Sequence, residues 1–130
     1  MRDSSLILIA DDDQGFQEIL GAKLKRNGFL VSEAHDGKQA VEKAANLHPD
    51  LIIMDINMPN ESGTEAVLDV KNNPETKDIK IVFFTGAKDP WPAFKDKNPE
   101  GAKAVGADDF INKSEDLDKI MEKIKLFLKK

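Results

Sequence analysis

Cysteine is absent from this chain of 130 residues. Disulfide bonds, thiolate metal sites and thiol nucleophiles are therefore excluded, and the usual signature of an oxidising compartment is missing. Long apolar runs are missing as well, because the longest one near the start, residues 6–10, is far shorter than a signal-peptide core or a membrane span. These absences predict a cytoplasmic protein that does not insert into a membrane.

The chain also lacks an excess of basic residues, with 19 Lys and Arg against 24 Asp and Glu and a formal net charge of -5. Such a charge offers nucleic acid no attractive field, so we expect no direct nucleic-acid binding. Only two histidines are present, His35 and His48, and neither has a partner pattern that suggests a role. The length fits one domain, and we expect a single domain over residues 1–130.

What the chain does contain is a set of short apolar runs bounded by turn-forming residues. Three runs that are apolar apart from Asp55 and Lys80 predict strands that are buried on both faces, and two mixed runs predict edge strands. Helical spacing between the runs predicts five helices, so the pattern indicates an α/β fold with a parallel sheet and helices on both faces. Placing the mixed strands at the edges gives the order 2-1-3-4-5, a flavodoxin-like doubly wound five-stranded sheet, partly by analogy with known folds. The apolar runs are residues 6–10, 51–55 and 79–84, and the mixed runs are 29–34 and 108–112.

The first and last helices are predicted with their caps. Asp13 should cap a helix that starts at Gln14 and buries one apolar face, consisting of Phe16, Ile19, Leu20 and Leu24. Ser114 should cap the last helix. Between them, residues 87–101 contain three prolines, so we expect a broken or shortened fourth helix after a long loop that carries Trp91 over the site.

Polar side chains that are distant in sequence follow the predicted strands. Asp11 and Asp12 follow the first strand, Asp55 ends the third, Thr85 follows the fourth and Lys113 follows the fifth. Because parallel strands end at the same edge of a sheet, we expect these five to converge where the strand order reverses. Neighbouring carboxylates repel each other, so either one takes a proton or a cation binds, and oxygen ligands favour Mg²⁺. Asp55 could then attack a phosphoryl group whose oxygens Thr85 and Lys113 hold.

These residues give the chain a resemblance to the response regulator receiver domains of two-component signalling. The resemblance covers essentially all 130 residues and is carried by residues 7–13, 51–59 with Gly63, 84–86 and 106–113. It implies that Asp55 is the phosphoacceptor. The domain would then not be an enzyme apart from its self-phosphorylation and autodephosphorylation at Asp55. It also implies that Asp12 binds Mg²⁺ directly, that Asp11 binds it through water, and that the Asn57 main-chain carbonyl is a further ligand.

The same resemblance implies the remaining roles. Thr85 and Lys113 would bind the phosphoryl group, and Phe110 would be the switch aromatic that turns inward when the threonine moves. A phosphohistidine on a histidine kinase or phosphotransfer protein would be the donor. No effector domain follows Lys130 in this sequence, so output is expected through an effector protein or a phosphorelay, unless the sequence is a segment of a longer protein. Ser114 stands where the family usually has proline.

Two other functions remain open from the sequence. A receiver-like interaction module that is never phosphorylated would keep the fold, although the complete acid set with Lys113 argues against it. A phosphohydrolase with an aspartyl intermediate resembles others of its class in placing the nucleophile after the first strand, with a second acid two residues on. Here Asn57 stands two residues after Asp55, so this alternative is weaker.

Overall fold

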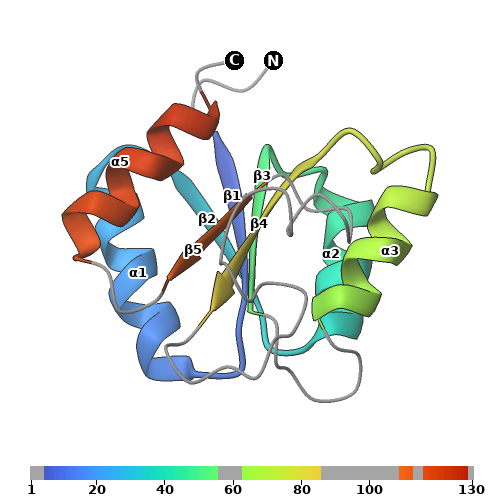
Figure 1. Ribbon diagram of the computed structural model, residues 1–130, viewed down its shortest axis with the longest axis horizontal. Coiled ribbons are helices and arrows are strands. Elements are labelled where there is room, and N and C mark those ends of the chain that lie inside the picture. The colour runs from blue at the N-terminus through green and yellow to red at the C-terminus, as the bar shows by residue number, and fades with distance from the viewer. Residues whose placement is uncertain (1–4, 56–62, 86–108, 113–115, 129–130) are drawn as a thin grey trace.

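The computed structural model describes residues 5–55, 63–85, 109–112 and 116–128. Its centre is a five-stranded parallel sheet with the order β2-β1-β3-β4-β5 (Figure 1). This order confirms the prediction, with the three apolar strands in the middle and the two mixed strands at the edges. The strands are β1 (Leu6–Ala10), β2 (Leu30–Ala34), β3 (Leu51–Asp55), β4 (Lys80–Thr85) and β5 (Asp109–Asn112).

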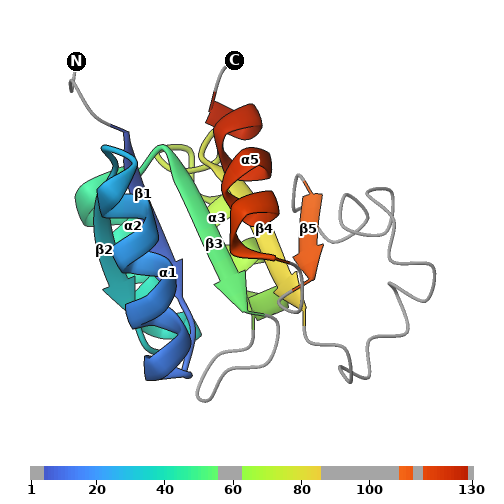
Figure 2. The same ribbon diagram turned by 90° about the vertical axis from the view of Figure 1, so that its left-hand side faces the viewer.

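Helices cover both faces of the sheet. In Figure 2, α1 and α5 lie on the side of the sheet toward the viewer, and α2 and α3 lie behind it. Because the central strands point alternate side chains to opposite faces, the buried residues separate into two apolar clusters, one under each helix pair. The helices are α1 (Gln14–Arg26), α2 (Gly37–Leu47), α3 (Gly63–Asn72) and α5 (Leu117–Leu128).

The helix ends follow from local hydrogen bonds. Asp36 caps α2, because its side chain accepts a hydrogen bond from the Gln39 N–H at 2.8 Å. In turn, the Gln39 side-chain oxygen accepts a hydrogen bond from the His35 N–H at 3.0 Å. Asn27 is the C-cap of α1, and Gly28 follows it with a φ of 89°, a left-handed conformation that glycine adopts without a Cβ clash. These local interactions fix the end of α1 and the start of α2.

The predicted inward face of α1 was wrong at one position. Ile19 is 58% exposed, whereas Leu20 and Leu24 are fully buried as expected. The buried face includes Gln17 and Gly21 instead. Two residues turn an α-helix by about 200°, so Gln17 and Ile19 cannot both face the sheet.

The predicted start of α5 was also wrong. The helix begins at Leu117, and the residue before it, Asp116, provides the cap: its carbonyl accepts from the Ile120 N–H at 3.0 Å and its carboxylate from the Asp118 N–H at 3.2 Å. Asp and Ser are comparably good caps, so composition alone does not choose between Asp116 and Ser114. On this helix Ile120, Met121 and Ile124 are buried, and Leu117 and Leu128 are partly buried against the same cluster.

Some predictions lie outside the described residues. They concern the fourth helix, the loop with Trp91, and the residues at 57, 113 and 114. Within the described ranges, no helix has the length and apolar character needed to cross a membrane.

Candidate functional site

Asp55 is the last residue of β3, a strand that is buried along its whole length. Its side chain is only 6% exposed, and its strand pairing places it beside Phe84 of β4. Burial of an ionised carboxylate is costly unless it has partners or a counterion. Asp55 therefore lies where the apolar core ends at the carboxyl edge of the sheet, with its charge held close to that core.

Asp11 and Asp12 form the turn between β1 and α1. The Asp11 N–H donates to the Ala34 carbonyl of β2 at 3.1 Å, which continues the β1–β2 pairing by one residue. The Asp11 carboxylate accepts from the Asp13 N–H at 2.9 Å and is 1% exposed, whereas Asp12 is exposed. Asp13 accepts from the Phe16 N–H at 3.1 Å and caps α1, as predicted. The turn is thus fixed by hydrogen bonds on both sides of Asp12.

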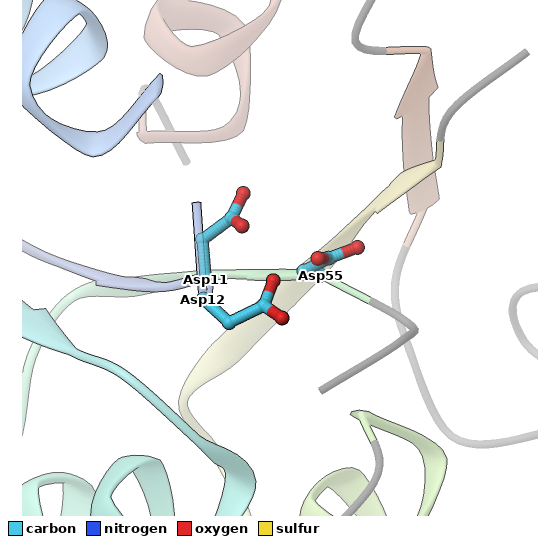
Figure 3. Close-up of side chains that lie close together, drawn as sticks. All are labelled: Asp11, Asp12 and Asp55. Atoms are coloured by element: carbon cyan, nitrogen blue, oxygen red, sulfur yellow. The ribbon is translucent and has the colours of Figure 1, made fainter. Parts of the chain in front are cut away.

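The carboxylates of Asp11, Asp12 and Asp55 come together at one point. One oxygen from each lies within 4.8 Å of the others. Figure 3 shows the Asp12 carboxylate extended toward Asp55, with Asp11 on the adjacent backbone position. Two of these groups are buried and one is exposed, so the cluster is closed on its inner side and can be reached from solvent.

The three neighbouring carboxylates offer only oxygen ligands, and this arrangement is suited to binding a hard cation. At an effective dielectric near 20, two charges about 5 Å apart repel by ~3 kcal/mol, and a divalent ion would reverse the sign of that interaction. Among the acidic and histidine side chains of the described residues, those of this cluster lie close enough together to bind a metal ion. An oxygen-only set fits Mg²⁺ better than Zn²⁺ or Cu²⁺.

The other predicted site residues are placed only in part. Thr85 is the last residue of β4, one position beyond the residue that pairs with Asp55, so its backbone reaches the same edge of the sheet. Phe110 lies in β5 and pairs with Phe83. The Thr85 and Phe110 side chains, and Asn57 and Lys113 as a whole, lie outside the described part of the structure.

One polar residue near the cluster escaped the sequence reasoning. Gln17 on α1 is fully buried and donates from its Nε2 to the carbonyls of Ile9 at 3.1 Å and Ala34 at 2.6 Å. The only signal in the sequence was its spacing, because residue 17 lies three positions before Leu20 and seven before Leu24, on the same face of a helix.

Comparisons with known proteins agree with this geometry. The family model of the response regulator receiver domain matches residues 7–125. Two curated relatives are the CAI-1 autoinducer sensor kinase/phosphatase CqsS of Vibrio cholerae, 33% identical over 119 residues, and the response regulator MprA of Mycobacterium ulcerans, 32% identical over 126 residues. The matches cover 91% and 95% of this chain. The chain spans only 16% of the first protein and 50% of the second.

Solved structures show the same fold. A response regulator from Chloroflexus aurantiacus is 26% identical with a TM-score of 0.86, covering 98% of this chain and 100% of that one. The receiver domain of the sensor histidine kinase PA1611 from Pseudomonas aeruginosa, solved with a magnesium ion in its active site cleft, is 22% identical with a TM-score of 0.84, covering 98% and 99%. With the family match over residues 7–125, the sheet order and the acidic cluster at its carboxyl edge, the chain belongs to the response regulator receiver domain family.

Proposed function

We propose that this receiver domain is a phosphorylation switch in which Asp55 accepts a phosphoryl group from a phosphohistidine. The observation that carries the proposal is the meeting of Asp11, Asp12 and Asp55 within 4.8 Å at the end of a buried strand. Asp55 is the member of this set that ends the central strand β3, so a group added to it changes the charge next to the core. A receiver domain is not a classical enzyme; its chemistry takes place on its own side chain.

The cation that fits the cluster is Mg²⁺. Asp11, Asp12 and Asp55, with the main-chain carbonyl of Asn57, would hold it, and the magnesium ion in the Pseudomonas receiver domain supports this choice. When bound, the ion neutralises carboxylate charge and orients phosphoryl oxygens. The burial of Asp11 and Asp55 fixes two ligands before the ion arrives, and the exposed Asp12 leaves a path for it from solvent.

Phosphoryl transfer to Asp55 exchanges one bond to phosphorus for another. An Asp55 carboxylate oxygen forms the new O–P bond as the N–P bond of the phosphohistidine breaks, and the imidazole nitrogen that leaves takes up a proton. The roles that we assign to Lys113 and Thr85 are to bind the oxygens of the transferred group by charge and by a hydroxyl hydrogen bond. Water later attacks the acyl phosphate and returns the carboxylate, which makes the switch reversible.

The phosphoryl group would then act on the strands beside Asp55. Asp55 pairs in register with Phe84, and Thr85 follows directly, so a bond from the new group to Thr85 pulls on the end of β4. The neighbouring strand β5 carries Phe110, which we propose as the switch residue. A ligand shifts a two-state equilibrium only by its different affinity for the two states, and the new charge supplies that difference here.

Membership in this family implies a kinase as a partner. We propose a histidine kinase or a phosphotransfer protein as the phosphoryl donor and a downstream effector protein as the target of the switch. The domain would work in the cytoplasm, where a kinase has access to ATP.

Intact-protein mass spectrometry tests the proposal. The protein is incubated with Mg²⁺ and a small phosphodonor such as phosphoramidate, with EDTA in a parallel sample. We expect a gain of one phosphoryl group in Mg²⁺ only, and none in Asp55→Asn. No gain in the wild type would favour the interaction module without phosphorylation, and steady turnover of a phosphorylated metabolite would favour a phosphohydrolase.

A further inference from the structure

Gln17 is the one fully buried residue of α1 with a polar side chain, and packing alone does not explain it. Its Oε1 has no hydrogen-bond partner among the described residues, although its Nε2 has two. A buried amide oxygen without a partner costs free energy, and an apolar side chain of the same length would avoid that cost. The structural role of this glutamine therefore lies in the two hydrogen bonds that its Nε2 donates.

These two bonds end at the strands that carry the acidic turn. The Ile9 carbonyl lies in β1, two residues before Asp11, and the Ala34 carbonyl ends β2. The Ala34 carbonyl also accepts the Asp11 N–H. Gln17 and the backbone of Asp11 therefore share one acceptor, so a displacement of either changes the position of the other.

The segment between Ile9 and Gln17 is closed into a ring by these contacts. Gln17 joins its two ends, since the side chain bonds back to β1 while the Gln17 N–H donates to the Asp13 carbonyl at 3.1 Å. Inside the ring, the Asp11 carboxylate accepts from the Asp13 N–H. The ring thus holds the two residues of the β1–α1 turn, Asp11 and Asp12, whose carboxylates cluster with that of Asp55.

The neighbouring aromatic contact fixes the helix that carries Gln17. The Phe16 ring meets the Phe84 ring edge-on, with centroids 5.5 Å apart and an interplanar angle of 61°. Phe84 pairs with Asp55 across β3 and β4. The first turn of α1 is therefore anchored both to the end of β4 and, through Gln17, to the ends of β1 and β2.

We propose that Gln17 is a positioning residue for the divalent cation: its Nε2 holds the β1–α1 turn so that Asp11 and Asp12 present their carboxylates together with Asp55. The inference rests on the proposed function, because only a site that binds a cation can lose affinity for it. Hydrogen bonds behind metal ligands typically change metal affinity by about 10–100-fold when they are removed.

The test compares Gln17→Met, which keeps the length and loses the donor, with the wild type. Mg²⁺ is titrated by isothermal calorimetry at a temperature where each protein is fully folded. We expect the Kd of Gln17→Met to rise by about 10-fold, the lower end of that range. Gln17→Leu serves as a second variant if Gln17→Met does not fold.

Leu24→Ala is the matched control, because Leu24 is equally buried on the same face of α1 but has no polar atom to offer. It should lower the melting temperature and leave the Kd for Mg²⁺ within about twofold, since a folded protein binds the ion with the same site whatever its stability. An unchanged Kd in both Gln17 variants, with normal binding by the wild type, would overturn the role of Gln17 alone. Absence of Mg²⁺ binding by the wild type would overturn the proposed cation site as well.

Discussion

Replacing Asp12 with asparagine should stabilise the protein in the absence of divalent cations. Asp12 is the exposed member of the cluster, and its carboxylate lies within 4.8 Å of oxygens of both Asp11 and Asp55. The substitution keeps the size of the side chain and removes its charge. It therefore removes the repulsion between Asp12 and Asp55, a pair that folding creates; Asp11 is the sequence neighbour of Asp12 and stays close to it in the unfolded chain as well.

The expected size follows from the geometry. Two unit charges about 5 Å apart repel by ~3 kcal/mol at an effective dielectric of 20 and by ~1 kcal/mol in bulk water. Because Asp12 is exposed, the lower value applies to the Asp12–Asp55 pair, which gives about 1 kcal/mol. With an unfolding entropy of about 2.1 cal/mol/K per residue, this corresponds to a rise of roughly 4 °C in Tm for a chain of this length.

The assay is thermal and urea unfolding of the wild type and Asp12→Asn, first in EDTA and then in Mg²⁺. In EDTA the variant should unfold at a higher temperature. In Mg²⁺ the wild type should gain about 1.8 kcal/mol when the ion is at 20 times its Kd, and the variant, which lacks one ligand, should gain less. Asp69→Asn on α3 is the control, an exposed aspartate outside the cluster, and it should show neither effect. A destabilised Asp12→Asn in EDTA would refute the electrostatic reasoning.

Two further predictions concern the helices around the site. Asp36→Ala removes the side chain that caps α2 and should lower the free energy of unfolding by about 1 kcal/mol in urea titrations, with no change in the Kd for Mg²⁺; a shift in that Kd would contradict a purely local role. The Lys23 ammonium, which hydrogen-bonds the Asp118 carboxylate at 2.6 Å, holds the pKa of Asp118 below its ordinary value. Because the folded pKa is the lower one, the contribution of this pair is present above the unfolded pKa near 4 and is lost as the pH falls through the folded value. The difference in stability between wild type and Asp118→Asn should therefore vanish in acid, and a difference that persists there would have another cause.

The architecture could be predicted because the strands differ in a way that the sequence records. A strand in the middle of a parallel sheet is buried on both faces and has to be apolar throughout, as Leu51–Asp55 is up to its last residue. The edge strand Leu30–Ala34 is exposed or partly buried over its first four residues and contains a serine and a glutamate. That contrast is enough to place the strands, and the sheet order then brings Asp11, Asp12 and Asp55 to one edge.

The errors arose where a position is decided by partners distant in sequence. The burial of Gln17 in preference to Ile19 depends on two carbonyls that the pairing of β1 with β2 leaves next to α1. Hydrophobicity alone assigns the isoleucine to the core. The start of α5 at Leu117 depends on a choice between two good capping residues, and the sequence contains no preference that separates them.

Locating the phosphoryl group tests the central claim most directly. After incubation with phosphoramidate and Mg²⁺, the acyl phosphate is reduced with borohydride, the protein is digested, and the peptide that contains the reduced residue is sequenced by tandem mass spectrometry. The account predicts that the modified residue is Asp55, that EDTA abolishes the modification, and that Asp12→Asn lowers its yield. Modification at another residue, or an equal yield at Asp55 in EDTA, would contradict the claim that the three carboxylates act as one site.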